Sequence, residues 1–163
     1  MVTQELLKNS IQAKWRKNHR NIYIILSAIT LTIGLFTIDP IFEKTDKSSY
    51  SLFMELSVIG ILLVVFIPCI IFYQVQYKKT IEVLPDYKIY EVLLEYPSRS
   101  FSYKYSYYYS VDFTTEDGEY IGKDTLPMFG ESWFSFGNNI SEYNDQTISI
   151  AYSVEKDRMV VIG

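Results

Sequence analysis

Hydrophobic residues are concentrated in two runs in the first half of the chain. The run 22–38 has 17 residues and no charge, and the run 52–73 has 22 residues and a single charge, Glu55. An α-helix rises about 1.5 Å per residue, so the runs would span roughly 25 and 33 Å, against about 30 Å for a bilayer core. A domain this small could not enclose two helices that are apolar on every side, so the runs predict a transmembrane hairpin rather than buried helices.

Small residues recur on one face of each predicted span and suggest where the two helices pack. The rows are Ser27, Thr30 and Gly34 in the first span and Ser57, Gly60 and Val64 in the second. Small side chains let helix backbones approach closely, which makes Gly34 and Gly60 candidate helix-packing residues. Glu55 lies one turn inside the outer boundary of its span. Its carboxylate either reaches the outer surface or is protonated, or it contacts a partner or an ion.

Basic residues flank the outer ends of this hairpin and predict its orientation. Those before the first span are Lys8, Lys14, Arg16, Lys17 and Arg20, and those after the second are Lys78, Lys79 and Lys88. The loop 39–51 contains only two basic residues, Lys44 and Lys47. The positive-inside rule therefore puts both termini in the cytoplasm and the short loop outside.

The first 20 residues have a helical pattern of their own. Leu7, Ile11 and Trp15 recur at intervals of four, with basic residues between them. This pattern fits a helix lying among lipid headgroups, and equally an extension of the first transmembrane helix. We therefore divide the chain into a basic amphipathic segment 1–20, a two-helix membrane segment 21–79 and an acidic, aromatic-rich β domain 80–163.

Beyond Lys79 the pattern changes from long apolar runs to alternation, which is typical of β-strands. Aromatic or apolar residues share one face of 90–96 and occupy every odd position of 101–113. A turn at Glu116-Asp117-Gly118 and a return strand 119–125 would complete a hairpin. The segments 147–152 and 158–162 predict two further strands around a turn at 155–157, whereas 127–145 reads as irregular. The expected fold is an α+β membrane protein, in which the helical hairpin precedes a small antiparallel β-barrel-like or curved-sheet domain of about five strands.

Three segments of this domain resemble a family of small bacterial membrane proteins of unknown function. They are Tyr107-Tyr108-Tyr109-Ser110-Val111-Asp112-Phe113, then Asp117-Gly118-Glu119-Tyr120-Ile121-Gly122, and Ile148-Ser149-Ile150-Ala151-Tyr152 with the closing Val160-Val161. The resemblance covers about 60 residues and implies transmembrane helices joined to a compact β domain in a bacterial cell membrane. This chain departs from the family in placing both helices first. It also has Ser153-Val154 where members tend to have Asn-Pro.

The composition sets aside several chemistries. Cys69 is the only cysteine and His19 the only histidine, and both precede the β domain, so a His- or Cys-based dyad is excluded there and a zinc site is not expected. No glycine-rich phosphate loop occurs. From Thr80 onward there are 6 basic and 14 acidic residues, a net charge of −8. Such a field disfavours nucleic acid and favours a basic partner. We expect no cofactor and no enzymatic activity.

Two sets of side chains are candidate partner-binding residues. One is part of the aromatic row, Tyr103, Tyr105 and Tyr107; such a row forms either core or an exposed platform. The other is the acidic set Glu91, Glu95, Glu116, Asp117 and Glu119. We expect a membrane-anchored, non-enzymatic protein-binding module at the inner face of a bacterial membrane, such as an immunity or accessory protein. The alternative is a small subunit of a membrane transport or envelope complex. Besides lipid and a second protein, another copy of the chain stays open as a partner.

Overall fold

The computed structural model describes residues 1–43, 49–99, 106–130 and 138–163, and within these ranges it describes the side chains of all but 37–43 and 49–55. The chain forms two compact units. One contains Met1–Trp15 together with Tyr77–Gly163, and the other is Arg16–Gln76. We call them the β unit and the helical unit. The sequence suggested a separate N-terminal segment 1–20, but the structure assigns its first 15 residues to the β unit.

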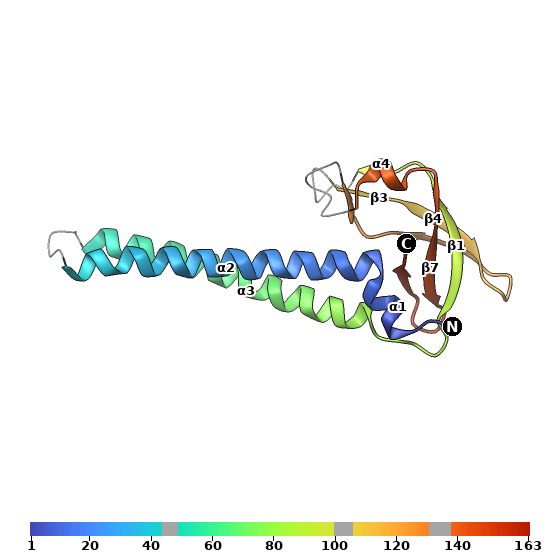
Figure 1. Cartoon of the computed structure of the whole chain (residues 1–163), viewed down its shortest axis with the longest axis horizontal. Helices are drawn as coiled ribbons and strands as arrows, with labels where there is room; N and C mark the ends of the chain where they lie inside the picture. The colour runs from blue at the N-terminus through green and yellow to red at the C-terminus, as the bar shows by residue number, and fades with distance from the viewer. Residues whose placement is uncertain (44–48, 100–105, 131–137) are drawn as a thin grey trace. The chain divides into compact units, whose positions relative to one another are not determined.

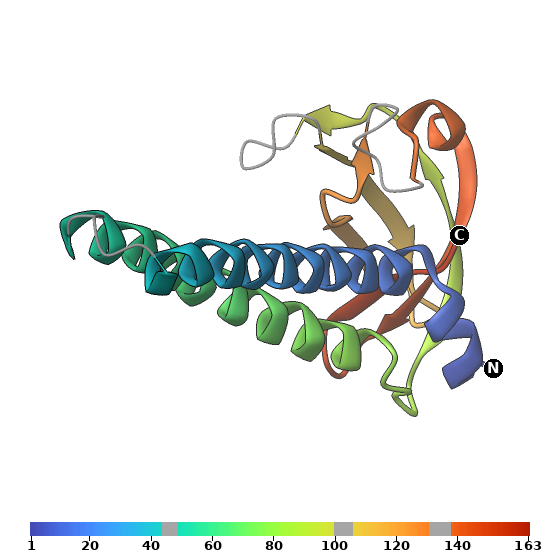
Figure 2. The same ribbon diagram turned by 60° about the vertical axis from the view of Figure 1, so that its left-hand side comes forward.

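The helical unit consists of parts of two long helices, α2 (Ile11–Glu43) and α3 (Ser49–Thr80), which run side by side in opposite directions (Figures 1 and 2). Both extend beyond the expected spans 22–38 and 52–73. The most apolar 18-residue windows within Ile11–Phe36 and Leu56–Thr80 have mean hydropathies of 1.3 and 2.8. By length and composition, each helix is long and apolar enough to cross a membrane.

The two helices pack along a seam of residues spaced by seven on α3. A Cβ atom added at the buried Gly34 would lie 3.0 Å from Cδ1 of Ile59. The Tyr23 ring lies 6.2 Å from that of Phe66 and 5.8 Å from that of Tyr73, measured between ring centroids. A repeat of seven keeps one stripe of a helix facing its partner. Gly34 therefore lies in this seam.

Gly60 lies outside this seam, contrary to the expectation. It is exposed, and a Cβ added there would meet no atom within 4 Å. Ile59, one residue earlier, faces Gly34 instead. One position along a helix is a rotation of about 100°, so the small-residue row of α3 points away from α2.

Polar contacts join the two helices at the other end of the helical unit. The Arg16 guanidinium donates to the Gln76 carbonyl oxygen at 2.6 Å, and Arg20 donates to the Gln74 side-chain oxygen at 2.6 Å. The His19 ring stacks on Tyr73 at 5.2 Å between centroids. Arg16 and Arg20, two of the basic residues used above to predict the orientation, therefore also join α2 to α3.

The β unit contains eight strands among the described residues, all paired antiparallel, and a short helix. The strands are β1 (Lys88–Leu94), β2 (Ser98–Arg99), β3 (Ser106–Tyr108), β4 (Ser110–Thr114), β5 (Tyr120–Asp124), β6 (Phe129–Gly130), β7 (Gln146–Ser153) and β8 (Arg158–Val161), and the helix is α4 (Ile140–Tyr143). They form three sheets, β1-β7-β8, β2-β3-β6 and β4-β5. The predicted α+β layout is confirmed. The barrel-like alternative is wrong for the part of the chain described, because these sheets are open.

The turns lie where the sequence predicted them, whereas the predicted long aromatic strand is divided into separate strands. Gly118 has φ +84° in the β4–β5 turn, and Asp157 has φ +47° in the β7–β8 turn. Both sit where the sequence predicted tight turns. The aromatic segment 101–113 is interrupted at Tyr109, which separates β3 from β4. The Tyr109 side chain is fully buried, and its ring meets the edge of Phe129 at 4.9 Å between centroids. Segment 127–145, read as irregular, contains β6 and α4.

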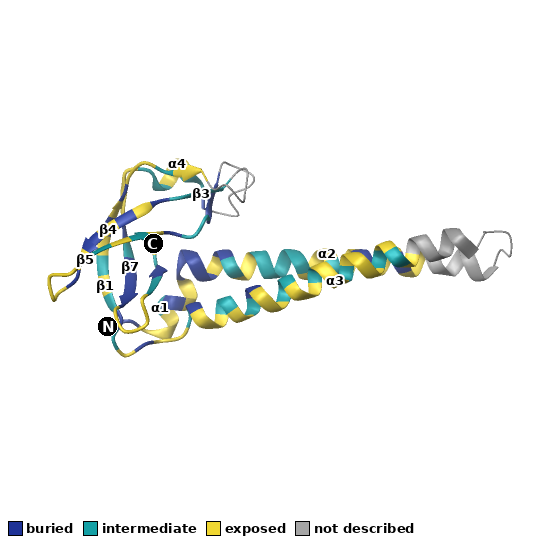
Figure 3. Cartoon of the chain, turned by 180° about the vertical axis from the view of Figure 1, so that it is seen from behind, coloured by how far each residue is buried: buried dark blue, intermediate teal, exposed yellow. Residues whose placement is uncertain are grey.

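The sheet β1-β7-β8 is covered on both faces, which explains the almost continuous burial of β7 (Figure 3). On one face the Phe113 ring of β4 lies 4.9 Å from Tyr90 and 5.2 Å from Tyr152, between centroids. On the other face, Ala151 and Val160 join a cluster with residues from outside the sheet. Its other members are Val2, Leu7, Leu84 and Tyr87, with Ile162 packed against them.

The chain's first helix, α1 (Gln4–Asn9), therefore belongs to the core of the β unit. Leu7 and Ser10 are completely buried. Ser10 ends α1 and begins α2: its hydroxyl donates to the Leu7 carbonyl at 2.6 Å and accepts from the Ala13 amide at 3.1 Å. This corrects the interpretation of 1–20 as a helix among headgroups, because Leu7 is surrounded by protein.

The first turn of α2 also bonds to the end of β8. The Ile11 amide donates to the Ile162 carbonyl at 3.0 Å, and the Val161 amide donates to Oε1 of Gln12 at 3.1 Å. The first amides of a helix have no partner within the helix, and a strand edge likewise leaves backbone groups unpaired. The two elements satisfy each other. We call this pair of hydrogen bonds the α2–β8 junction.

We expect Leu7→Ala to destabilise the β unit by about 2–5 kcal/mol, the usual cost of removing a fully buried leucine side chain. Hydrogen–deuterium exchange of peptides from β7 and β8, in detergent-solubilised protein, should accelerate accordingly. The matched control is Leu93→Ala, since Leu93 is 47% exposed; its effect should stay below about 1 kcal/mol. Equal exchange in Leu7→Ala and wild type would contradict the packing of α1 described above.

We expect Gly34→Leu to destabilise the helical hairpin and Gly60→Leu to leave it unchanged. A leucine at position 34 must displace Ile59, and overpacking of this kind typically costs about 1–3 kcal/mol. The measurement is the thermal unfolding midpoint in one detergent for both variants. A larger loss for Gly60→Leu would show that the seam is assigned to the wrong face of α3.

Candidate functional site

Several carboxylates of the β unit hold the fold together. Asp86 accepts hydrogen bonds from the Glu155 amide at 2.9 Å and from the Ser153 hydroxyl at 2.7 and 2.9 Å. The Glu155 amide, followed by the Ser153 hydroxyl, lowers the pKa of Asp86 below its usual 3.8. Ser153 is completely buried and accepts in turn from the Lys156 amide at 3.1 Å. Asp86 therefore anchors the β7–β8 turn to the segment that leads into β1.

Asp157 and Glu82 have similar structural roles. Asp157 accepts from Lys123 of β5 and from the Tyr152 hydroxyl, both at 2.6 Å. Burial, and then this bond to Asp157, raise the pKa of Tyr152 to about 12. Glu82 pairs with Arg158 at 2.7 Å. These acids hold turns and connecting segments of the β unit against its strands and are poor candidates for binding a partner.

The acidic residues proposed from sequence are spread along β1 from one end to the other. Glu116, Asp117 and Glu119 lie at the β4–β5 turn, where Glu116 forms an ion pair with Lys88. Glu95 follows the other end of β1, about 20 Å away for a seven-residue strand. Glu91 lies between them and accepts from the Ser149 hydroxyl at 2.8 Å. The structure thus does not gather the five acids into one site.

Three of these acids have no structural partner. Glu95, Asp117 and Glu119 are exposed, and over the described ranges their carboxylates make no hydrogen bond or ion pair. Because their carboxylates form no contact that stabilises the fold, these three of the five acids have a charge that is available to a ligand.

The tyrosine row divides between core and regions that the structure leaves undescribed. Tyr103 and Tyr105 lie outside the described residues, as does the side chain of Glu55. Tyr107 is half-buried in β3. Tyr109, next in the row, is core, and burial raises its pKa to about 12. The described part of the row therefore favours a packing role.

The exposed aromatic that sequence reasoning missed is Tyr96. It was expected to continue the inner face of β1, but the strand ends at Leu94 and Tyr96 turns outward with 84% of its surface exposed. Its φ of +50° is in the left-handed region, which is rare for a bulky residue and costs of the order of 1–3 kcal/mol. The signal in the sequence was Pro97, because the residue before a proline is restricted and often marks the end of an element.

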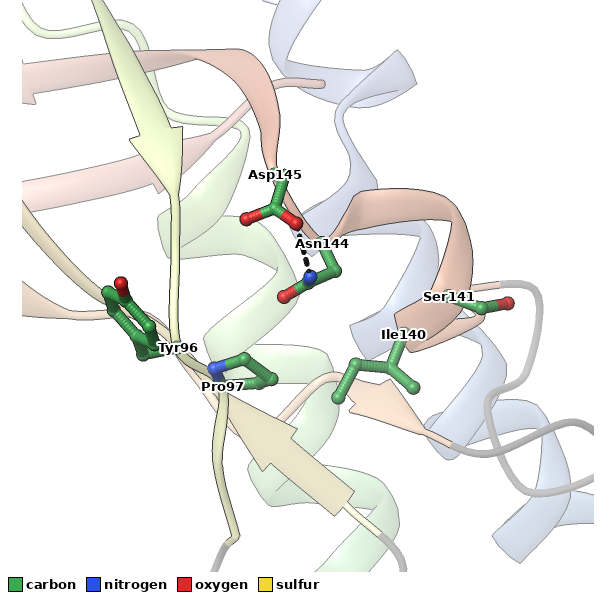
Figure 4. A pocket seen from close by; sticks show the side chains of 6 residues that line it. All are labelled: Tyr96, Pro97, Ile140, Ser141, Asn144 and Asp145. Carbon is green, nitrogen blue, oxygen red and sulfur yellow. Dashed lines mark hydrogen bonds between the residues drawn. The ribbon is translucent and has the colours of Figure 1, made fainter.

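Tyr96 borders two hollows in the surface of the β unit. The first, of about 600 Å³, is lined by Tyr96, Pro97, Ile140, Ser141, Asn144 and Asp145 (Figure 4). The second, of about 510 Å³, is lined by Leu93, Glu95, Tyr96, Ser98, Ser110 and Asp112. Each contains at least one carboxylate, and Tyr96 borders both. We call this surface the Tyr96 site.

The carboxylates of the Tyr96 site differ in how far they are already engaged. Asp145 accepts from the Asn144 amide group at 2.7 Å. Asp112 lies beside Tyr120 and raises the pKa of that phenol through a hydrogen bond. Glu95 is unengaged, as described above. Across the described residues, no group of three or more His, Cys, Asp or Glu side chains is placed to hold a metal ion.

Comparison with known proteins adds no family or fold relationship. A scan against protein-family models, a search of curated proteins and a search of solved structures each find no match. The resemblance to small bacterial membrane proteins stays a prediction, and the function is inferred below from the structure and the sequence.

We expect acid to loosen the β7–β8 turn through Asp86. A carboxyl whose pKa is lowered by folding contributes stability that is complete above its unfolded value, here 3.8, and that is lost as the pH falls through the lower folded value. Between about pH 4 and pH 2, the thermal unfolding midpoint should therefore fall less steeply in Asp86→Asn than in wild type. Asp117→Asn, which removes an unpartnered carboxylate, should retain the wild-type slope. Identical slopes in all three proteins would rule out the anchoring role.

Proposed function

We propose that this protein is a membrane-anchored, non-enzymatic protein-binding module at the inner face of a bacterial membrane, with an immunity or accessory role. In this proposal α2 and α3 cross the bilayer, and the β unit binds a basic region of another protein. The main observation in its support is that the β unit is built from two segments far apart in the sequence, Met1–Trp15 and Tyr77–Gly163.

This composition supports a two-pass topology. Residues that pack in one core must lie on the same side of a membrane, so an even number of crossings has to separate residue 15 from residue 77. Two apolar helices fill that interval. The large apolar side chains exposed on α2 and α3 would be unfavourable in water over such an area and are suited to lipid. The basic residues at the outer ends of the hairpin favour a cytoplasmic β unit.

Charge supports binding as the role of the β unit. The net charge of −8 from Thr80 onward includes Glu95, Asp117 and Glu119, whose carboxylates form no ion pair in the described part of the chain. An acidic field of this kind attracts basic partners and repels anionic lipid, so the β unit is better suited to a protein than to the bilayer surface.

One observation favours the alternative, a subunit of a membrane transport or envelope complex. Gly60 is exposed on α3 with open space around it, although glycines usually mark close helix contacts in membranes. In that case a helix of another protein would pack there, and the helices rather than the β unit would determine the partner.

The first part of the test asks whether the chain is embedded in a membrane and on which side the β unit lies. The full-length protein should remain in bacterial membranes washed with alkaline carbonate and be released by detergent. Protease added outside intact cells should leave the β unit undigested. Release by carbonate would refute the membrane anchor, and digestion from outside would reverse the orientation.

The second part measures binding of a fluorescent oligolysine peptide to the full-length protein in nanodiscs of uncharged lipid. We expect Glu95→Lys or Glu119→Lys to weaken binding severalfold and Glu5→Lys, an equal charge change at an exposed position of α1, to weaken it less than twofold. Equal effects of all three would indicate only non-specific attraction and contradict the proposal. Loss of a co-purifying membrane complex in Gly60→Leu alone would favour the subunit alternative.

A further inference from the structure

We infer that the Tyr96 site binds an extended, arginine-containing segment of the partner, with an arginine side chain stacked on the Tyr96 ring. This inference rests on the proposed function and identifies its contact surface. It starts from the conformation of Tyr96, which has φ +50° and precedes Pro97, yet leaves its side chain 84% exposed. Burial of the ring does not offset this unfavourable backbone. Such a combination is typical of residues held ready for a ligand.

The surrounding structure keeps Tyr96 in this position. The Asp145 amide donates to the Leu94 carbonyl at 2.8 Å, two residues before Tyr96. Asp145 is itself left-handed, with φ +59°, so the two unusual residues lie on segments joined by one hydrogen bond. Pro97 fixes the chain on the other side of Tyr96. The ring is therefore presented by a constrained backbone and not by a freely moving loop.

The chemistry around the ring selects a cation. Glu95 and Asp112 line one hollow and Asp145 the other, and the described lining of both contains no lysine or arginine. A guanidinium group stacks on an aromatic face and pairs with carboxylates at its edges, which an ammonium group does less well. Glu95 is adjacent to Tyr96 in the chain and makes no other polar contact in the described structure. An arginine on the Tyr96 ring can thus meet a free carboxylate.

The arrangement of the two hollows points to an extended occupant. Both are bordered by Tyr96, so a chain that fills both contacts Tyr96 along its path. In a β-strand, residues i and i+2 project to the same side about 6.6–7 Å apart. A segment with the pattern Arg-x-Arg would direct two arginines to this surface while the residue between them faces away.

The test uses full-length protein in nanodiscs of uncharged lipid and a nine-residue fluorescent peptide containing Arg-x-Arg. The control peptide replaces both arginines by citrulline, which has nearly the same shape and no charge. We expect Tyr96→Ala to weaken binding of the arginine peptide about tenfold and Tyr96→Phe to keep it within about twofold. Val154→Ala truncates an exposed apolar side chain in the β7–β8 turn, 46% accessible, and should also stay within twofold. Binding of the citrulline peptide as tight as that of the arginine peptide would overturn the inference.

A second variant distinguishes a ligand contact from a merely structural role. Tyr96→Gly removes the ring and suits the left-handed backbone, so it should raise the thermal unfolding midpoint while abolishing the tyrosine-dependent binding. Unchanged binding in Tyr96→Ala and Tyr96→Gly would overturn the Tyr96 site. If Glu95→Lys or Glu119→Lys still weakened oligolysine binding in that case, the proposed function would stand. Failure of wild type to bind either basic peptide would reject both.

Discussion

The α2–β8 junction is the constraint on which the architecture of the β unit depends. It joins the first turn of a long apolar helix to the last strand of a sheet through the Ile11 and Val161 amides. Each element would otherwise leave backbone groups unsatisfied, at a cost of about 1–3 kcal/mol for each buried group. The junction also places α1 over the sheet, where Leu7 covers Ala151 and Val160. Without it, one face of β7 would be exposed and the core would be limited to the side facing β4.

The junction also matters for the proposed function. Residues 11–15 belong both to the β unit and to the start of α2, a helix whose later part is apolar enough for lipid. α2 begins in the β unit at Ile11 and continues into the helical unit beyond Trp15. If the proposed topology holds, no separate linker intervenes between the binding domain and the first span. The acids that stabilise the strands, such as Asp86 and Asp157, are distinct from those left free. Mutations can therefore change the free carboxylates of this domain without changing the acids that stabilise its fold.

Local patterns in the sequence predicted the elements whose environment is set by near neighbours. The two apolar runs became α2 and α3, and the turns at Gly118 and Asp157 appeared where short-range turn chemistry put them. The misses concern contacts between residues far apart in the chain. Alternation cannot distinguish one strand from two separated at Tyr109, and the pattern of Leu7 fits a protein core as well as a lipid surface. The Tyr96 site was missed in part for the same reason: Pro97 marks the end of the strand locally, but the hollows beside Tyr96 are lined by residues distant in the chain, such as Asp145 and Asp112.

The separation of 149 residues between Gln12 and Val161 has a consequence for biogenesis. During translation the N-terminal segment leaves the ribosome first and must wait, with Leu7 uncovered, until β8 has been synthesised. In the proposed topology, two hydrophobic segments are delivered to the insertion machinery in that interval, and native closure of the β unit is a late event that reports correct insertion of both. A nascent chain in which one of them failed to insert would then leave Gln12 and Val161 on opposite sides of the bilayer and present unpaired strand edges to quality-control proteases.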